Sequence, residues 1–315
     1  MSALALKGPS WVTVRQYRRT LWTTAGLVLL SLAVIGGLRV WDGRTPDVRL
    51  PDGTWAPADE SRGYETLRIA MEYAGTGLLL LPLLVGAFVA GPLIAREFES
   101  GTYRLGLTQS VTPTAWLRAK VVTTAVTALA ATLALIGVYR LGWGRVAGTY
   151  QLAWSDRGPY EGTGIVLVGY VLAAVAVGTL VGLLVRRTLL AMAVTGLVTG
   201  LVLFVLGGLR WSFLGVETIT GPVDVVRGPL LVPDGGLMMD TGLLTRDGHR
   251  IAEWSCLEGN NPPACWASKN VTGQYLDYHP QSHFWPTQLA ETGILLALAA
   301  LALLAAFRVL RARHP

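Results

Sequence analysis

The sequence predicts an all-α integral membrane protein with six transmembrane helices and both termini in the cytoplasm. Three observations lead to this prediction: the apolar composition, the length of the apolar blocks and the distribution of the basic residues. Hydrophobic residues make up 52% of the 315-residue chain and charged residues only 15%, with a mean hydropathy of +0.46. Soluble domains carry about a quarter charged residues. A chain of this size with so little charge is therefore not a soluble globule.

The apolar residues gather in six blocks, and each block approaches or exceeds the roughly 20 residues that cross a bilayer. No block contains Lys or Arg, and the only acid inside any of them is Glu291, near the start of the last. The first block is longer than the core of a signal peptide and lacks a following cleavage site, so we expect a permanent helix. The predicted spans are residues 21–38, 74–95, 121–139, 164–185, 189–209 and 289–307.

The basic residues predict the orientation, because short cytoplasmic loops are enriched in Lys and Arg. With both termini inside, the inner segments hold 13 of the 26 bases and two of the 20 acids, a net charge of +11. The remaining 13 bases and 18 acids, with Glu291 of the last block counted on the outer side, give a net charge of −5. The bases lie at helix ends rather than on one face, so nucleic-acid binding is not expected. The outer connectors are residues 39–73, 140–163 and 210–286, and the inner ones are 96–120 and 186–188.

Two inner segments carry local structural signals. Residues 1–20 space their aromatic residues as a helix would, which predicts an interfacial helix on the inner leaflet, with a frayed basic tail as the alternative. Residues 96–112 form a compact polar element between the second and third spans. Gly101 is a natural stop for the second helix, and Thr112-Pro113 is a natural start for the third.

Cys256 and Cys265 are the only cysteines, and both fall in the large outer loop of residues 210–286. Two cysteines this close together on the oxidising side of a membrane are expected to form a disulfide, with metal binding as the alternative. The disulfide would tie the loop into an extracellular lid.

Small residues four apart occur in the fourth and fifth spans and allow helix backbones to approach closely. We expect Gly178 and Gly182 to pack within the bundle. For Gly196 and Gly200, packing within the bundle and packing at a subunit interface remain equally open.

Several kinds of chemistry have no motif in this sequence. It contains no G-x-x-x-x-G-K-[ST] loop for ATP, no H-E-x-x-H and no G-x-S-x-G. His279 and His283 are four apart, but Pro280 follows the first, so a helical metal pair is not expected. A membrane enzyme is therefore the least favoured function. An acid inside a span is costly without a cavity or a partner, so Glu291 either lines a substrate path or reaches the outer headgroups.

Residues 96–120 read REFESGTYRLGLTQSVTPTAWLRAK. This segment resembles one found in the permease subunits of ABC-2-type exporters, and especially the form ESGTYRL-x-x-TQSVTR-x-x-W of actinobacterial members. The order of six spans, an inner element after the second and a large outer loop after the fifth is also similar. The resemblance implies an ABC-2 (type-V/G-like) exporter permease fold in a bacterial plasma membrane.

In that family the segment is a coupling helix that docks on a separate ATP-hydrolysing subunit. The resemblance implies that two copies of that subunit bind ATP and Mg²⁺, and that this chain binds no cofactor. Six spans are half of the family's pathway, which implies a homodimer, or a heterodimer with a sister permease, surrounded by membrane lipid. The implied ATPase contact is formed by Glu97, Glu99, Gly101, Thr102, Tyr103 and Arg104, with a smaller contact at Arg186 and Arg187.

We therefore expect a permease that exports an amphiphilic drug, peptide or lipid with energy from a partner ATPase. A membrane sensor or immunity protein of the same fold, without transport, is the alternative.

Overall fold

The computed structural model describes residues 15, 18–51, 53–57, 62–103, 112–224, 228–256 and 262–313, except for the side chains of residues 234 and 313. The chain forms two compact units. The membrane domain comprises Met1–Arg210 and Gln288–Pro315, and the loop domain comprises Trp211–Thr287. Six helices of the described part are long and apolar enough to cross a membrane, which confirms the predicted number of spans.

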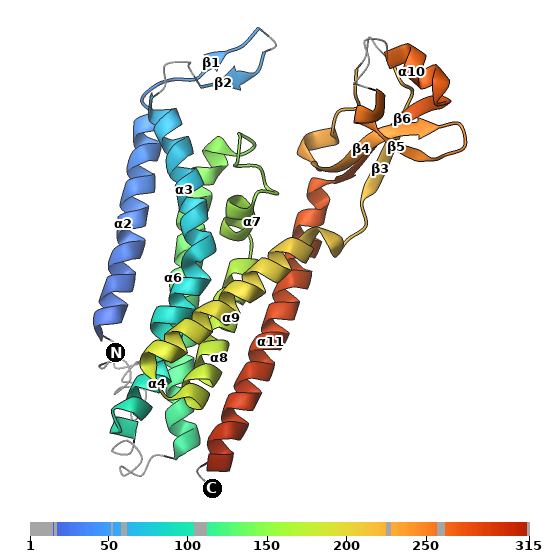
Figure 1. Cartoon of the computed structure of the whole chain (residues 1–315). Coiled ribbons are helices and arrows are strands. Elements are labelled where there is room, and N and C mark those ends of the chain that lie inside the picture. Colours follow the sequence, from blue (N-terminus) through green and yellow to red (C-terminus); the bar gives the residue numbers. More distant parts are fainter. Residues whose placement is uncertain are drawn as a thin grey trace. The chain divides into compact units, whose positions relative to one another are not determined.

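Four of the six spans continue well beyond the apolar blocks that predicted them, because local sequence signals rather than hydropathy decide where a helix ends, whereas α8 and α9 keep within two residues of their blocks. Figure 1 shows the beginning of α2, the end of α4 and the end of α11 at the same end of the membrane domain. The spans are α2 (Arg18–Asp42), α3 with η1 and α4 (Arg62–Leu84, Val85–Ala90, Gly91–Glu99), α6 (Pro113–Val146), α8 (Val166–Val185), α9 (Thr188–Leu209) and α11 (Phe284–Arg313).

The two signals that flank the connector between the second and third spans act as the sequence predicts. α4 ends at Glu99, and Gly101 then adopts a φ of +71°, in the left-handed region that favours glycine. Thr112 caps α6: its hydroxyl accepts a hydrogen bond from the backbone N–H of Ala115 at 3.2 Å. The predicted interfacial helix of residues 1–20 lies almost entirely outside the described residues, and residues 18–20 already belong to α2.

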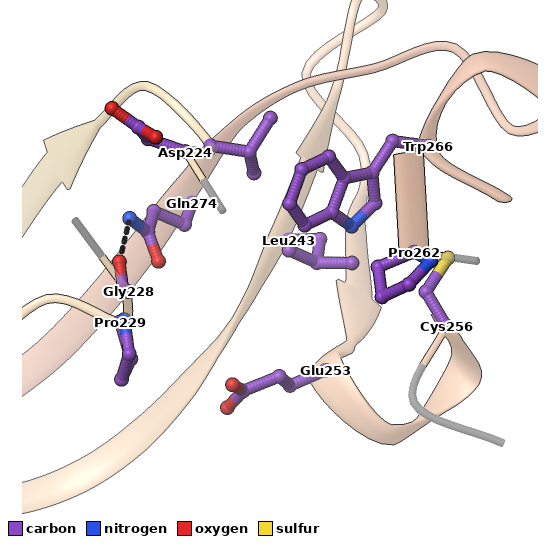
Figure 2. A pocket seen from close by; sticks show the side chains of 10 residues that line it. Asp224, Gly228, Pro229, Leu243, Glu253, Cys256, Pro262, Trp266 and Gln274 are labelled. Atoms are coloured by element: carbon purple, nitrogen blue, oxygen red, sulfur yellow. Dashed lines mark hydrogen bonds between the residues drawn. The ribbon is translucent and has the colours of Figure 1, made fainter. Parts of the chain in front are cut away.

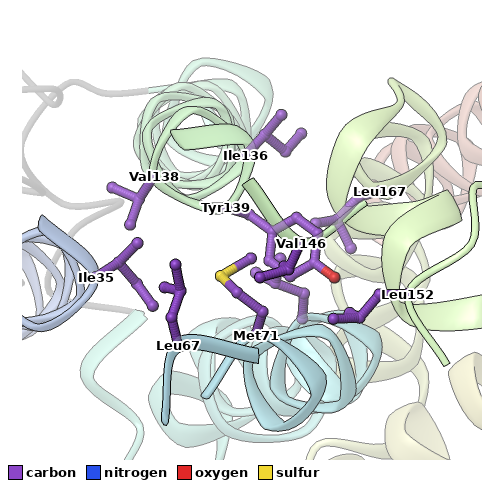
Figure 3. Close-up of a cluster of buried hydrophobic side chains, with 10 residues drawn as sticks. Ile35, Leu67, Met71, Ile136, Val138, Tyr139, Val146, Leu152 and Leu167 are labelled. Atoms are coloured by element: carbon purple, nitrogen blue, oxygen red, sulfur yellow. The ribbon is translucent and has the colours of Figure 1, made fainter. Parts of the chain in front are cut away.

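A buried apolar cluster joins α2, α3, α6 and α8 (Figure 3). Lipid is as apolar as these side chains, so their contribution comes from close packing rather than from escape from water. Gly142 makes room for this packing, because a Cβ at that position would lie 2.3 Å from the sulfur of Met71. The cluster consists of Ile35, Leu67, Met71, Leu78, Ile136, Val138, Tyr139, Val146, Leu152 and Leu167.

The glycines of the fourth span allow it to pack directly against the second. A Cβ on Gly178 would lie 2.5 Å from the Cβ of Ala90, and one on Gly182 would lie 3.2 Å from the backbone nitrogen of Ala95. These contacts confirm that the Gly178 pair packs within the bundle.

The glycines of the fifth span also face the second span of the same chain. A Cβ on Gly196 would lie 3.4 Å from the Cβ of Ala87, and one on Gly200 would lie 3.3 Å from Leu83. Both glycines thus pack within the bundle, but they are only half-buried, so a subunit interface at this pair stays a prediction.

One turn of the second span, η1, is a π-helix. It follows Pro82, which lacks an N–H for the helical hydrogen-bond pattern. Single π-turns inside helices often mark functional sites and places where a helix bends. This one packs against both α8 and α9: a Cβ on Gly86 would lie 3.0 Å from the hydroxyl of Thr199 and 3.4 Å from Ala174.

The loop domain contains an antiparallel sheet in the strand order β3-β6-β4-β5, which the sequence analysis did not anticipate in a chain predicted to be all-α. The longest strands, β4 and β6, have nine residues each, so they lack the apolar blocks of about 20 residues on which that analysis depended. The disulfide between Cys256 and Cys265 is present and joins η4 (Glu253–Cys256) to α10. The other elements are β3 (Glu217–Gly221), β4 (Leu237–Thr245), β5 (Arg250–Ala252), α10 (Pro262–Ser268) and β6 (Val271–His279).

Asp277 is the buried carboxylate of this sheet. It accepts hydrogen bonds from the guanidinium of Arg250 at 2.6 Å and from the hydroxyl of Thr218 at 2.5 Å. Burial alone would raise the pKa of Asp277, but these hydrogen bonds and the charge of Arg250 outweigh burial and hold the pKa below its ordinary value.

The first prediction concerns the contact between the second and fourth spans. Gly178→Ala places a methyl group in the space now filled by Ala90, so the helices have to separate. Overpacking of this kind costs about 1–3 kcal/mol. Thermal unfolding in detergent should show the loss, while Gly137→Ala, at a helical position with nothing within 4 Å, should stay within about 1 kcal/mol of wild type. Equal stability of the two variants would contradict this account of the packing.

The second prediction concerns acid. Because the pKa of Asp277 is lower in the folded loop domain than in the unfolded chain, its stabilisation is fully present above about pH 4. It is lost as the pH falls through the folded pKa. Hydrogen exchange at the β6 amides, corrected for intrinsic rates, should therefore accelerate below about pH 4 in wild type and respond less in Asp277→Asn. Asp247→Asn, at an exposed turn, should behave as wild type does.

Candidate functional site

The connector between the second and third spans begins on a helix that is anchored in the bundle. α4 buries Leu93 and Ile94, and Glu97 lies one turn further along the same face. Its carboxylate accepts a hydrogen bond from the ammonium of Lys120 on α6 at 2.6 Å. The two side chains are 12% and 3% exposed, so the pair is largely shielded from solvent. Removing either partner would leave a charge in a poorly hydrated place.

Glu99, at the last position of α4, binds the beginning of the fifth span. Its carboxylate accepts hydrogen bonds from the backbone N–H of Thr188 at 2.9 Å and from the hydroxyl of the same residue. Thr188 is the first residue of α9, where the unpaired N–H groups and the helix dipole favour an anion. Glu99 therefore caps a helix that lies 89 residues away in the sequence.

Aromatic contacts complete the anchoring of this connector. The ring of Phe98 lies 4.5 Å from that of Tyr103 and meets the ring of Trp116 edge-on at 6.2 Å. The guanidinium of Arg186 lies over Phe98 at 5.2 Å from the ring centre. Arg186 is the residue that ends α8, with a φ of +58°. The connector thus contacts α6, the end of α8 and the start of α9.

The structure brings most of the predicted coupling residues together at one end of the membrane domain. Among them, Glu99, Thr102, Arg186 and Arg187 are exposed. Arg104 lies outside the described residues. Glu97 differs from the expectation of a surface contact, because it points inward to Lys120, and Glu99 is already engaged by Thr188.

Sequence reasoning missed three residues of this site. Lys120 and Phe98 lie inside residues 96–120, and the sequence held a signal for each. Lys120 directly precedes an apolar block, and Phe98 stands between two glutamates. Thr188 gave no signal, because its role depends on the folded position of Glu99.

A cavity of about 720 Å³ lies beside this connector. One wall is apolar, and the guanidinium-bearing residues Arg19 and Arg96 are part of its lining. Such a combination suits a molecule with an apolar body and a polar or anionic group. The full lining is Arg19, Thr20, Phe88, Val89, Pro92, Leu93, Arg96, Glu97, Ser100 and Thr102.

Glu291 fits neither of the two expectations for it. Its side chain is completely buried, so it neither reaches headgroups nor faces an open path in this structure. Its carboxylate accepts hydrogen bonds from Nε of Arg210 at 2.9 Å and from the hydroxyl of Tyr170. Nη2 of Arg210 also binds Oε1 of Glu161, at 2.5 Å. The sequence analysis missed this cluster because Arg210 and Glu161 both lie just beyond the ends of apolar blocks.

The loop domain has a cavity of its own, of about 210 Å³ (Figure 2). Trp266 and Leu243 line it beside the disulfide residue Cys256, and the side-chain amide of Gln274 donates to the carbonyl of Gly228. Ligand pockets usually measure about 300–1,000 Å³, so this space is small for a drug-sized cargo.

The described residues contain no group of three or more His, Cys, Asp or Glu placed to hold a metal ion. Nδ1 of His279 lies 2.9 Å from Nδ1 of His283, so the two imidazoles share a hydrogen bond. Burial lowers the pKa of His279, and the charge of His283 acts in the same direction, against the backbone contact with Trp211.

Residues 54–210, about half of the chain, match the family model described as ABC-2 membrane transporter related. The chain belongs to this family, in agreement with the resemblance of residues 96–120. The family suggests a permease component of an ABC transporter, a membrane subunit that associates with an ABC ATPase subunit. No curated protein and no solved structure matches the chain.

The third prediction tests the shielded ion pair by a double-mutant cycle. Lys120→Met should cost about 3 kcal/mol, because Glu97 keeps its charge without its partner. Adding Glu97→Gln should recover part of that loss, which gives a coupling energy of about 1–3 kcal/mol in detergent unfolding experiments. The exposed pair Glu65 and Arg68 is the matched control and should couple by less than about 1 kcal/mol. Additive losses at Lys120 and Glu97 would contradict this role.

Proposed function

We propose that this chain is the permease subunit of an ABC exporter and that the connector receives the movement of a separate ATPase subunit. One observation carries the proposal. The last turn of α4 is fixed to three other spans at once, through Glu97 to α6, through Glu99 to α9 and through Phe98 to the end of α8. A polar loop that merely crossed the aqueous side would not need such contacts.

Force applied at residues 101–103 would then reach most of the bundle. Gly101 allows the chain to turn sharply out of α4, and Thr102 is exposed to a partner there. The π-helical turn η1 lies immediately before α4 and provides a point at which the second span can bend. Closure of the ATPase subunits would tilt the second span with the third and fifth, and would switch the permease between two states.

The orientation in this proposal places the connector in the cytoplasm and the loop domain outside. The beginning of α2 and the end of α11 lie at the same end of the membrane domain as α4 (Figure 1). The segments at that end carry the excess of Lys and Arg, as cytoplasmic segments do. The disulfide supports an oxidising environment for the loop domain. A bacterial plasma membrane fits this arrangement.

Two copies of the permease, identical or sister chains, would work with two ATPase copies that hold ATP and Mg²⁺. The described part of α9 presents an apolar face with Leu197, Leu201 and Phe204 between 60% and 74% exposed. This face suits lipid or a second permease. Gly196 and Gly200 would pack against the second span of the same chain while this apolar face makes the contact.

The cargo in this proposal is an amphiphile: a drug, a peptide or a lipid. The cavity beside the connector supports this class, because Phe88 and Leu93 offer an apolar wall and Arg19 and Arg96 offer positive charge. Entry there, followed by release on the side of the loop domain, would be export.

The fourth prediction tests the docking site by co-purification with the ABC ATPase subunit that the proposal requires. The double variant Thr102→Arg and Tyr103→Ala should weaken recovery of the ATPase about tenfold or more, because it changes exposed Thr102 and the half-buried ring of Tyr103 beside it. Tyr150→Ala, which removes an exposed tyrosine between the third and fourth spans, should leave recovery unchanged. Equal recovery with both variants would reject the docking site, and no recovery with wild type would reject the permease assignment.

A further inference from the structure

We propose that Glu161 binds one exchangeable proton beside the ion pair of Arg210 and Glu291, and that the neutral cluster of these three residues ties α7 (Arg157–Thr163) and α11 to the end of α9. The proposal concerns these residues alone and does not depend on transport or on an ATPase partner.

The geometry gives two carboxyl groups and one guanidinium. Arg210 donates from Nη2 to Glu161 at 2.5 Å and to Glu291 at 3.1 Å, and from Nε to Glu291 at 2.9 Å. Arg210 and Glu161 are 2% exposed and Glu291 is 0% exposed. With all three groups ionised, the cluster would carry one uncompensated negative charge out of contact with water. A buried carboxyl in this position gains a proton instead.

The other titratable groups around the cluster do not supply the missing positive charge. Tyr160 of α7 lies under the guanidinium at 3.7 Å, and Tyr170 of α8 donates its hydroxyl to Glu291. Tyr139 of α6 lies near Glu161, and Asp156, just before α7, places its negative charge near Tyr139. Each of these four groups is neutral or acidic.

Among the described residues, the nearby cations of the neighbouring helices hydrogen-bond groups other than these two carboxyls. Arg140 of α6 donates to the backbone carbonyl of Thr163 from Nε at 2.8 Å. α3 packs against α7 where Gly75 meets Gly158, and its Arg68 pairs with Glu65 and Glu72. Arg210 is therefore the one cation among the described residues that hydrogen-bonds the two carboxyls.

The position of the proton follows from the hydrogen bonds of Glu161. Its Oε2 is buried and has no hydrogen-bond partner among the described residues. An ionised oxygen left alone in this way is costly, whereas a protonated one carries no charge. Burial raises the pKa of Glu161 to about 7, and the opposing effect of Arg210 is smaller. Both carboxyls bind the same guanidinium nitrogen, so a negative charge on Glu291 adds to the cost of a negative charge on Glu161.

A proton suits the site better than a metal ion, because the guanidinium already occupies the place between the two carboxylates where a cation would bind. Loss of the proton would leave two like charges on either side of Arg210 with a net charge of −1. Repulsion would then loosen α7 from α11. Because the pKa of Glu161 is raised in the folded protein, the stabilisation is present at low pH and is lost as the pH rises through about 7.

The fifth prediction is tested on the full chain in lipid nanodiscs stepped between about pH 6 and pH 8, around the raised pKa. Infrared difference spectra should show the loss of one protonated carboxylic acid band per chain as the pH rises, together with a falling unfolding temperature. Glu161→Gln keeps the shape of the neutral acid and leaves Arg210 paired with Glu291, so it should fold, lack the band and lose this pH dependence. The exposed control Glu65→Gln should keep both.

Glu291→Gln also leaves one carboxylate for one guanidinium, so it should lack the band as well. A wild-type protein without a titrating acid band would overturn the proposal, and so would a band that survives in either cluster variant. If Glu161→Gln fails to fold, the wild-type titration and Glu291→Gln still decide. These spectra do not depend on an ATPase partner. Failure to recover an ATPase in the fourth experiment would therefore not count against the proton site.

Discussion

A charge carried into a lipid-embedded helical bundle has to find its partner inside the protein, because lipid cannot replace water. This constraint organises both ends of the membrane domain. At one end Lys120 neutralises Glu97, and at the other Arg210 gathers Glu161 and Glu291. Between the two ends, the six apolar blocks contain no basic residue. The ionic contacts therefore fix the register of helices that are otherwise joined by packing alone.

The fifth span connects the two ends directly. α9 begins at Thr188, which receives the carboxylate of Glu99, and it is followed by Arg210, which holds the buried acids. A 22-residue helix is about 33 Å long, which is close to the thickness of the bilayer core. A displacement of the connector at one end would therefore be felt at the ion cluster at the other. Straight helices transmit such displacements because their packed contacts have few alternative arrangements.

The second span, unlike the straight fifth span, is irregular. It carries Pro82 and the π-helical turn η1 in its middle, and it is the span whose backbone approaches α8 most closely, at Ala90 and Gly178. A span that is both irregular and tightly held can bend at one place while it keeps its neighbours in contact. η1 continues into α4, and α4 continues into the connector, so the bend and the proposed partner surface belong to one continuous part of the chain.

The sequence by itself determined the features that depend on neighbouring residues. Apolar blocks set the six spans, Gly101 and Thr112 set the ends of the connector, and the close cysteines set the disulfide. Only the tertiary structure decided which charges meet. Lys120 lies 23 residues from Glu97, Thr188 lies 89 from Glu99, and Arg210 lies 81 from Glu291. Capping, helix length and loop closure over a few residues are local properties, whereas a partner across the bundle exists only after the helices have packed. For this reason Glu291 looked isolated in the sequence, although it is one of the most completely buried and paired residues of the fold.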